Sequence, residues 1–380
     1  MSSGEQTQVT SLQKLQQWFL QQALPIWTNT TAYDAAEYRF AERLDFRAQP
    51  VVPNEFRLMV QARQVATLAR AHKAGVWADD GRLLAIYDHM RQRYRRTGGE
   101  PGWAFAIGPD HQVTSAQRDL YAHAFILYAI GCLYRAHKEP RLLADADEIL
   151  GDIETIFARA PGYVSVMPAA GPWREQNPHM HLLEALLELF EASGQDRYLA
   201  GAANLFHLFR NQLVRTAPHV VRERYTDDWS ATEQGSDSVI EPGHQFEWAW
   251  LLSKFQKHTG RDLSVEIAAL VDFATRYGMD ATTGAVFDSV SAKGTVTKSS
   301  TRVWVQTEAV RMLTEAGNHT LAARVAGRLV ALHLPDVLRG GWFDRLTPDN
   351  GIADDFMPAS TLYHLAGAVF DSSMHRPITA

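Results

Sequence analysis

The chain has 380 residues, of which 46% are hydrophobic and 21% are charged, a composition typical of a folded globular protein. Its formal net charge at pH 7 is −6, and acidic and basic residues are interspersed along the sequence. This pattern excludes the basic footprint of a nucleic-acid binder and argues against a membrane-surface protein. The single cysteine, Cys132, excludes an intrachain disulfide and a cysteine metal site.

The first residues lack the charged-then-apolar pattern of a secretory signal, and no apolar run reaches about 18 residues. We therefore expect a cytoplasmic protein without a transmembrane segment. No linker rich in Pro, Gly or Ser interrupts the chain, so we predict one domain over residues 1–380.

Helical periodicity dominates the sequence and predicts about twelve helices. In chain order the predicted helices span 10–24, 54–75, 80–96, 114–137, 140–159, 178–193, 195–215, 242–259, 261–277, 302–317, 319–333 and 358–372. The links between them alternate in kind, because short turns with Gly or Pro alternate with long loops that carry strand-like pieces. The strand-like pieces span 37–46, 102–113, 162–168, 284–297 and 340–351.

The short links recur roughly every 55–65 residues, which indicates a repeat of structure rather than of sequence. Six antiparallel helical hairpins, each with one tight end and one elaborate end, can close into a ring. We therefore predict an all-α ring of six hairpins, with short β-hairpins in the long loops on one face. An open α-solenoid and a two-domain bundle are the alternatives.

Polar residues gather near the start of every second predicted helix, in otherwise apolar patterns. A buried polar group costs about 1–3 kcal/mol if it is left unpaired, so six such helices indicate a shared functional cavity. The residues are Arg63 on the second helix, Asp119, Tyr121 and His123 on the fourth, Asn177, His179, His181 and Glu184 on the sixth, Glu241, His244, Glu247 and Trp248 on the eighth, Trp304, Gln306 and Glu308 on the tenth, and Tyr363 and His364 on the twelfth.

The spacing of these residues places carboxylates beside imidazoles. His181 and Glu184 are three residues apart, and so are His244 and Glu247, which makes each pair neighbours on one helical face. A carboxylate beside an imidazole fixes its tautomer and raises its basicity, as a general base requires. Asn177 lies four residues before His181 on the same face. His123 and His179 are expected to be structural or to contact other site residues rather than a substrate.

Other chemistries fit the sequence less well. The HMH segment at 179–181 lacks the HExxH spacing of a zinc site, and no glycine-rich nucleotide loop or GxSxG elbow is present. We therefore predict neither a cofactor nor a metal. A glycosidase that uses two of Asp119, Glu247 and Glu308 stays an alternative. Three histidines fit proton transfer at a sugar carbon better.

The chain resembles the N-acylglucosamine 2-epimerase superfamily, which includes mannose isomerases, cellobiose 2-epimerases and sulfoquinovose isomerases, from about residue 10 to 372. The resemblance favours the mannose isomerase branch, although DLYAHAF carries Ala122 where an acidic residue is expected. It implies an (α/α)6 barrel and metal-independent chemistry on unphosphorylated sugars. The motifs that carry it are VQARQ (60–64), DLYAHAF (119–125), NPHMHLLEA (177–185), GHQFEWAWLL (243–252), VWVQTEA (303–309) and YHLAGA (363–368).

The resemblance also implies roles for individual residues. Arg63 would contact the substrate near O1 and O2 and stabilise an enediolate, while His244 and His364 would be the acid–base pair. His181 would assist ring opening or bind the sugar, and Glu247 would orient His244. The remaining substrate-binding candidates are Tyr121, Asn177, Trp304, Gln306, Trp248 and Glu184.

The sequence thus predicts an aldose–ketose isomerase, with D-mannose and D-fructose as the expected pair. A 2-epimerase acting on N-acylglucosamine, mannose/glucose or cellobiose is the main alternative, and a sugar-binding protein without activity is another. A sugar-phosphate isomerase is a further alternative, whose phosphate contacts would be Arg57, Arg174, Arg222 and Arg224. The expected partner is a small sugar, neither nucleic acid nor membrane, and the oligomeric state is not readable from the sequence.

Overall fold

The protein is described here by a computed structural model in which the chain divides into two compact units. Unit 1 comprises Met1–Ala32, Arg43–Gln49 and Val239–Ala380, and unit 2 comprises Tyr33–Glu42 and Pro50–Ser238. The single domain expected from the sequence stays a prediction. The described residues are 3–29, 31–169, 171, 173–214, 217–231 and 239–371.

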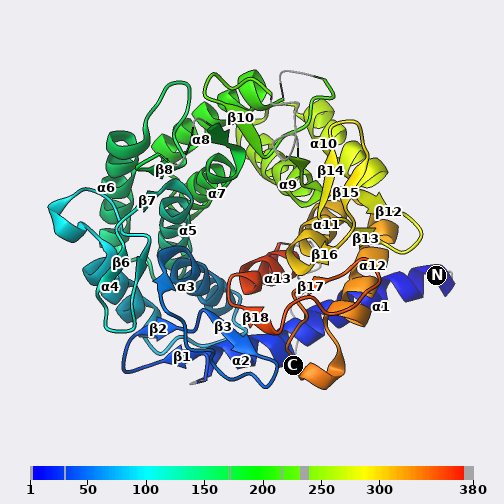
Figure 1. Ribbon diagram of the computed structural model, residues 1–380, viewed down its shortest axis with the longest axis horizontal. Coiled ribbons are helices and arrows are strands. Elements are labelled where there is room, and N and C mark those ends of the chain that lie inside the picture. The colour runs from blue at the N-terminus through cyan, green and yellow to red at the C-terminus, as the bar shows by residue number, and fades with distance from the viewer. Residues whose placement is uncertain are drawn as a thin grey trace. The chain divides into compact units, whose positions relative to one another are not determined.

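Unit 2 contains three helical hairpins. The first helices of these hairpins, α3, α5 and α7, pack side by side in a row, and each is followed by a helix that packs on one side of that row (Figure 1). We call α3, α5 and α7 the row helices of unit 2. The bounds are Leu58–Lys73 for α3, Arg82–Tyr94 for α4, Leu120–His137 for α5, Pro140–Phe157 for α6, Gln176–Ser193 for α7 and Asp196–Leu208 for α8.

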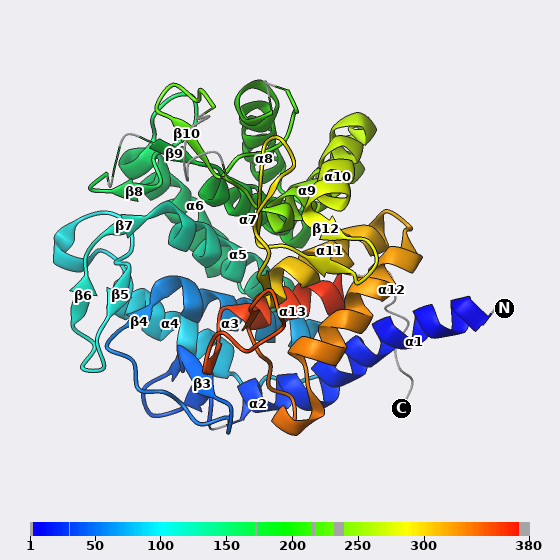
Figure 2. The same cartoon turned by 45° about the vertical axis from the view of Figure 1, so that its right-hand side comes forward.

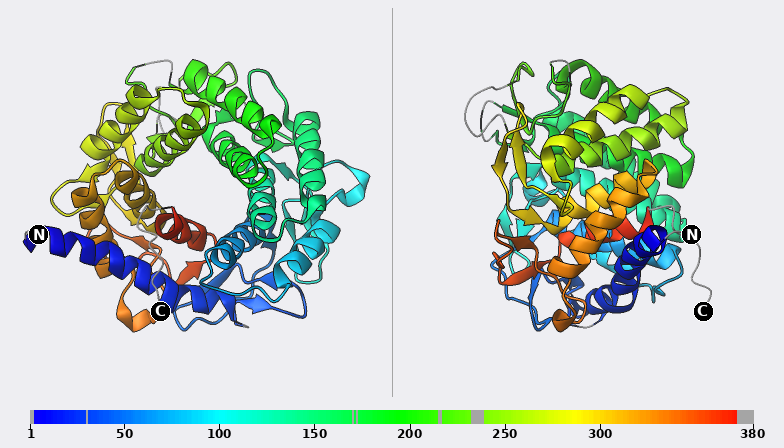
Figure 3. Two further views of the ribbon diagram at one scale, coloured as in Figure 1. Left: turned by 180° about the vertical axis from the view of Figure 1, so that it is seen from behind. Right: turned by 90° about the vertical axis from the view of Figure 1, so that its right-hand side faces the viewer.

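Unit 1 repeats this arrangement with the row helices α9, α11 and α13. The chain's first helices complete its third hairpin, because α1 packs along α12 (Figure 3) and Phe19 meets Phe370 of α13 edge-on at 5.7 Å between ring centroids. The bounds are Ser3–Trp18 for α1, Leu24–Thr28 for α2, Pro242–Thr259 for α9, Ser264–Gly278 for α10, Val303–Glu315 for α11, His319–Arg328 for α12 and Thr361–Phe370 for α13.

All twelve predicted helices are present within the described residues. Helix α9 has the predicted bounds, because Pro242 suits its first turn and Gly260 adopts the left-handed conformation that ends it. The predicted start at residue 114 is wrong, since strands precede α5 and that helix begins at Leu120. Residues 215 and 372, which end two predicted helices, lie outside the described residues. None of the helices that the structure describes is long and apolar enough to cross a membrane.

A short β-strand lies just before each row helix, and Figure 2 labels β4, β7 and β9 ahead of the row helices of unit 2. The strand-like pieces of the long loops are confirmed in place, but several pair with a neighbouring loop rather than in a local hairpin. Strand β5 (Ala106–Ile107) pairs locally with β6 (Val113–Ser115), whereas β8 (Val166–Met167) pairs with β7. The strands that precede row helices are β4 (Phe56–Arg57), β7 (Arg118–Asp119), β9 (Trp173–Glu175), β11 (Val239–Ile240), β16 (Thr301–Arg302) and β18 (Phe356–Pro358).

His123 and His179 tie the first turn of a row helix to the loop beside it. In each ring Nδ1 donates to the backbone carbonyl four residues earlier, and Nε2 accepts from a loop backbone N–H. The partners are Asp119 O (2.6 Å) and Trp103 N (3.0 Å) for His123, and Glu175 O (2.8 Å) and Tyr163 N (3.1 Å) for His179. Both imidazoles are therefore structural, as expected.

Glutamine takes the same place on two other row helices. Gln306 of α11 accepts from Val286 N at 3.0 Å, and its amide nitrogen donates to Val286 O at 2.7 Å. Gln61 of α3 holds the backbone N and O of Phe40 in the same way. We call these four side chains, His123, His179, Gln61 and Gln306, the loop clamps.

The loop clamps predict a pH dependence of folding. Burial lowers the pKa of His123 and of His179 from 6.5 to about 4. The unfolded chain therefore binds more protons between these values, so stability falls as the pH drops from about 6.5 toward 4. The cost is roughly 2 kcal/mol per histidine at pH 5.

We expect His179→Gln to remove the part of this pH-dependent loss of stability that His179 causes, because glutamine already makes the same contacts on α3 and α11. Denaturant unfolding of the wild type and the variant at pH 7.5 and pH 5 measures the effect. The difference in unfolding free energy should be small at pH 7.5 and favour the variant at pH 5. An equal pH dependence of the two proteins would contradict the assignment.

Candidate functional site

The first group of predicted site residues lies within unit 2 and joins its three row helices. Arg63 of α3 donates a hydrogen bond from Nη2 to the phenol oxygen of Tyr121 on α5. Its guanidinium carbon also lies 4.1 Å from the ring centroid of Phe125. The Phe125 ring lies 4.5 Å from the imidazole of His181 on α7. These contacts fix the orientation of a buried cation and a buried imidazole.

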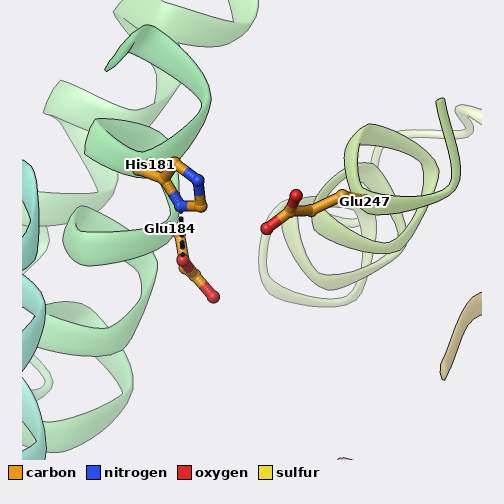
Figure 4. Close-up of side chains that lie close together, drawn as sticks. All are labelled: His181, Glu184 and Glu247. Atoms are coloured by element: carbon orange, nitrogen blue, oxygen red, sulfur yellow. Dashed lines mark hydrogen bonds and ion pairs between the residues drawn. The ribbon is translucent and has the colours of Figure 1, made fainter. Parts of the chain in front are cut away.

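His181 and Glu184 form the pair expected from their spacing. His181 Nδ1 lies 3.0 Å from Glu184 Oε2, and the two side chains are 2% and 3% exposed (Figure 4). Glu247, the third side chain drawn in Figure 4, belongs to α9 of unit 1. The carboxylate holds the proton of His181 on Nδ1, which makes Nε2 the basic nitrogen of the ring.

Asn177 lies one helical turn before His181, as its spacing predicts. Its Oδ1 is shielded from solvent and has no hydrogen-bond partner among the residues that the structure describes. A shielded acceptor of this kind is suited to a hydroxyl donor of a ligand. Phe125, whose ring contacts both the Arg63 guanidinium and the His181 imidazole, was not a predicted site residue, because a lone aromatic residue on a helix is typical of a packed core.

The second group lies within unit 1 and also joins three row helices. The Trp304 ring of α11 contacts two imidazoles, with centroid distances of 4.8 Å to His244 of α9 and 5.5 Å to His364 of α13. A Cβ atom on Gly243 would lie 2.6 Å from Trp304 Cζ3. The glycine that precedes His244 in the GHxxEW motif is therefore needed for this close approach.

His364 is paired with a carboxylate that the sequence did not assign to it. Its Nδ1 lies 2.7 Å from Glu308 Oε1, and the Glu308 side chain is fully buried. Arg311 lies one turn after Glu308 and donates to its other oxygen at 3.2 Å. Residue spacing could not reveal this pair, because the imidazole and the carboxylate come from different helices.

His244 faces Glu241, with 3.5 Å between Nδ1 and Oε2. Glu241 precedes His244 by three residues, so the same spacing rule that suggested Glu247 also applies to Glu241. Glu247 is buried, and one of its oxygens lies within 4.8 Å of ligand atoms of Glu308 and His364. The expected role of Glu247 in orienting His244 stays a prediction.

Two further predicted contact residues have structural surroundings. Gln306 is a loop clamp, and its amide is bonded on both sides to Val286. Trp248 is fully buried. We propose no substrate contact for either residue.

Glu247, Glu308 and His364 each offer one possible ligand atom for a divalent cation. The surroundings do not favour one, because the Nδ1 of His364 already bonds Glu308 and Arg311 adds a positive charge at the same carboxylate. A second cation at this carboxylate would meet electrostatic repulsion. The donor set therefore fits a proton-transfer group better than a metal centre.

Comparisons with known proteins identify the family. The family model for N-acylglucosamine 2-epimerase matches residues 40–368. The chain belongs to the N-acylglucosamine 2-epimerase family. It is therefore an enzyme, a sugar isomerase or epimerase, and the resemblance seen in its motifs is confirmed.

Individual members of this family are similar along most of the chain. A mannose-6-phosphate isomerase of Rhizobium meliloti (strain 1021) is 30% identical over 93% of this chain and 94% of its own. A D-mannose isomerase of Thermobifida fusca is 25% identical over 87% of both chains. A crystal structure of D-mannose isomerase superimposes with a TM-score of 0.85 at 22% identity, covering 96% of this chain and 97% of that one. The predicted fold class, an (α/α)6 barrel, is confirmed.

The contact between Gly243 and Trp304 leads to a prediction. We expect Gly243→Ala to destabilise the protein by about 1–3 kcal/mol, because the new methyl group overlaps the indole in a packed region. Turnover should fall as well, since Trp304 would shift relative to both imidazoles.

Gly151→Ala is the matched control, because Gly151 lies in α6 and a Cβ there meets nothing within 4 Å. That variant should be as stable as the wild type or more stable, with unchanged turnover. Thermal unfolding and steady-state kinetics of both variants measure the difference. Equal behaviour of the two variants would disprove the role of Gly243.

Proposed function

We propose that the protein is a metal-independent aldose–ketose isomerase that interconverts D-mannose and D-fructose. The observation that supports it most is the pair of imidazoles that contact the Trp304 ring, each with a carboxylate beside Nδ1. Two imidazoles of this kind can accept and return a proton near neutral pH, as an isomerisation through an enediolate requires.

In the proposed reaction one of His244 and His364 removes the C2 proton of the ring-opened sugar. The electron pair of the broken C–H bond forms the C1–C2 double bond, and the carbonyl oxygen at C1 takes the negative charge of a cis-enediolate. A proton delivered to C1, with transfer of the O2 proton to O1, then gives the ketose with its carbonyl at C2. Trp304 supplies a flat apolar surface beside the two imidazoles, which suits the C–H face of a sugar.

The unit 2 group has a separate proposed role, taken from the family resemblance. Arg63 stabilises the negative charge of the enediolate, and His181 assists ring opening or binds the sugar. Tyr121 and Asn177 bind sugar hydroxyls. Stacking on Phe125 and the bond to Tyr121 support the role of Arg63, because a preorganised cation stabilises developing charge without reorganising.

A sugar phosphate is a less favoured substrate, although one similar protein is named a mannose-6-phosphate isomerase. Three of the four arginines considered for a phosphate already form ion pairs with carboxylates, which reduces the positive charge that they can offer. These pairs are Arg57 with Glu42 (2.9 Å), Arg174 with Asp227 (3.0 Å) and Arg224 with Glu175 (3.2 Å).

A 2-epimerase is the second candidate, and the family description supports it. Epimerisation would use the same two imidazoles, with the proton returned to C2 from the opposite face. A glycosidase is less favoured, because Asp119 caps α5 by accepting from Ala122 N, and Glu308 already bonds His364 and Arg311. The cytoplasmic location expected from the sequence belongs to the same proposal.

Incubation of the enzyme with D-mannose in deuterated water, followed by NMR, tests the reaction. We expect D-fructose with deuterium at C1, because the proton removed from C2 exchanges with solvent before it reaches C1 in part of the turnovers. D-Glucose with deuterium at C2 as the main product would replace the isomerase by a 2-epimerase. D-Mannose 6-phosphate assayed in parallel should be converted far more slowly. Activity should also persist in EDTA.

Substitutions of the two histidines test the acid–base assignment. We expect His244→Gln and His364→Gln each to lower kcat by at least about a hundredfold, the usual contribution of a positioned general acid or base. Arg63→Met should lower kcat more than it raises KM, since its proposed partner is the enediolate-like transition state. The exposed His207, changed to Gln, is the matched control and should retain full activity. Near-normal turnover of either imidazole variant would disprove the mechanism.

A further inference from the structure

The two histidines of the proposed acid–base pair each begin a chain of contacts made by the same residue types in the same order. Each imidazole contacts a glutamate, the glutamate contacts an arginine, and the arginine contacts an aspartate. We call each set a relay, the α13 relay being His364–Glu308–Arg311–Asp371 and the α9 relay being His244–Glu241–Arg302–Asp288. Both relays lie within unit 1.

The α13 relay is short and buried. Glu308 Oε1 lies 2.7 Å from His364 Nδ1, Glu308 Oε2 lies 3.2 Å from Arg311 Nη1, and Arg311 Nη2 lies 2.6 Å from Asp371 Oδ2. Glu308 is fully buried, and Arg311 is 1% exposed. Two helices build it, since α11 supplies Glu308 and Arg311 at three-residue spacing, and α13 supplies His364 and leads directly to Asp371.

The guanidinium of Arg311 is packed closely against neighbouring residues. Its carbon lies 3.3 Å from the centroid of the Trp250 ring. On the α13 side it passes Gly367, where a Cβ would lie 3.5 Å from the same carbon. A cation in such a position is fixed in orientation, and it is the charge that balances the buried Glu308 carboxylate.

The α9 relay has the same order with longer contacts and more exposure. Glu241 Oε2 lies 3.5 Å from His244 Nδ1, Glu241 Oε1 lies 3.0 Å from Arg302 Nη2, and Arg302 Nε lies 2.8 Å from Asp288 Oδ1. Glu241 and Arg302 are 22% and 21% exposed. Electrostatic interactions are weaker where water has access, so this relay constrains its imidazole less.

We propose that Arg311 and Arg302 are positioning residues: each holds the glutamate beside one histidine of the pair as an oriented carboxylate, which keeps the imidazole proton on Nδ1 and makes Nε2 the nitrogen that exchanges protons with the sugar. The catalytic part of this proposal rests on the proposed function. The tautomer part does not, because it concerns the resting protein.

The proposal has a direct physical basis at Arg311. Without the guanidinium, Glu308 would be a buried carboxylate that has lost its balancing cation, and burial favours the protonated form of a carboxyl group. A protonated Glu308 donates to Nδ1 instead of accepting from it. The ring proton then moves to Nε2, which removes the basic nitrogen from the position that turnover requires.

The experiment compares Arg311→Met with Arg311→Lys, and Arg302→Met with Arg302→Lys. Nitrogen-15 NMR of histidine-labelled protein measures which ring nitrogen carries the proton, with His364→Gln and His244→Gln spectra to assign the signals. Steady-state kinetics measure kcat and KM, and thermal unfolding checks that each variant is folded. Arg276→Met is the matched control, because Arg276 forms an exposed ion pair with Asp272 away from both relays.

We expect Arg311→Met to move the His364 proton from Nδ1 to Nε2 and to lower kcat about tenfold or more, with a smaller change of KM. Arg311→Lys should recover part of the kcat and the Nδ1–H tautomer, because it restores the charge. Arg302→Met should act on His244 in the same direction but less strongly. Arg276→Met should change neither the tautomers nor kcat.

An unchanged tautomer in both methionine variants would overturn the proposal, whatever happens to activity. Arg302→Met and Arg311→Lys keep the test decisive if Arg311→Met does not fold. A changed tautomer with unchanged turnover would overturn the catalytic part of the proposal together with the assignment of the histidine pair. Lost turnover of both His→Gln variants, with normal tautomers and kcat in every arginine variant, would leave the proposed function standing and overturn this inference alone.

Discussion

The attachment of loop backbone to the first turn of four row helices, α3, α5, α7 and α11, is a constraint on which the site depends. The loop clamps Gln61, His123, His179 and Gln306 hold loop backbone with buried hydrogen bonds. Side chains two residues apart on a helix point in nearly opposite directions. A single turn can therefore grip a loop on one face and present a polar group on the other. The residues two positions from the clamps are Arg63, Tyr121, His181 and Trp304.

Electrostatics adds a second constraint within each group. Glu184 and Glu308 are buried beside imidazoles, and a buried charge is costly unless a partner balances it. In unit 1 arginines provide the balance, and their own position depends on packing, as with Arg311 against Trp250 and Gly367. The charge distribution around the imidazoles of unit 1 therefore depends on how these arginines are packed.

Local patterns in the sequence predicted the helices and one ion pair well. Helix α9 was placed correctly because Pro242 and Gly260 mark its ends, and His181 with Glu184 because both lie on one helical face. The start of α5 was misplaced, since residue 114 lies in β6, which pairs with β5, and β7 directly before the helix pairs with β8 of another loop. Contacts between helices were also beyond reach, so the partner of His364 had to come from the structure.

The loop clamps also affect which parts of a loop can vary without moving the site residues on the row helices. The hairpin of β14 (Ser289–Ser291) and β15 (Val296–Lys298) begins just after Val286, where Gln306 grips the chain. Asp288 of the α9 relay lies just beyond that anchor, and β14 pairs with β11 ahead of α9, so only changes at the tip of the hairpin leave these contacts of α9 and α11 in place. Sequence changes at that tip can therefore accumulate while the side chains on α9 and α11 keep their positions, which is a physical route to variation on one scaffold.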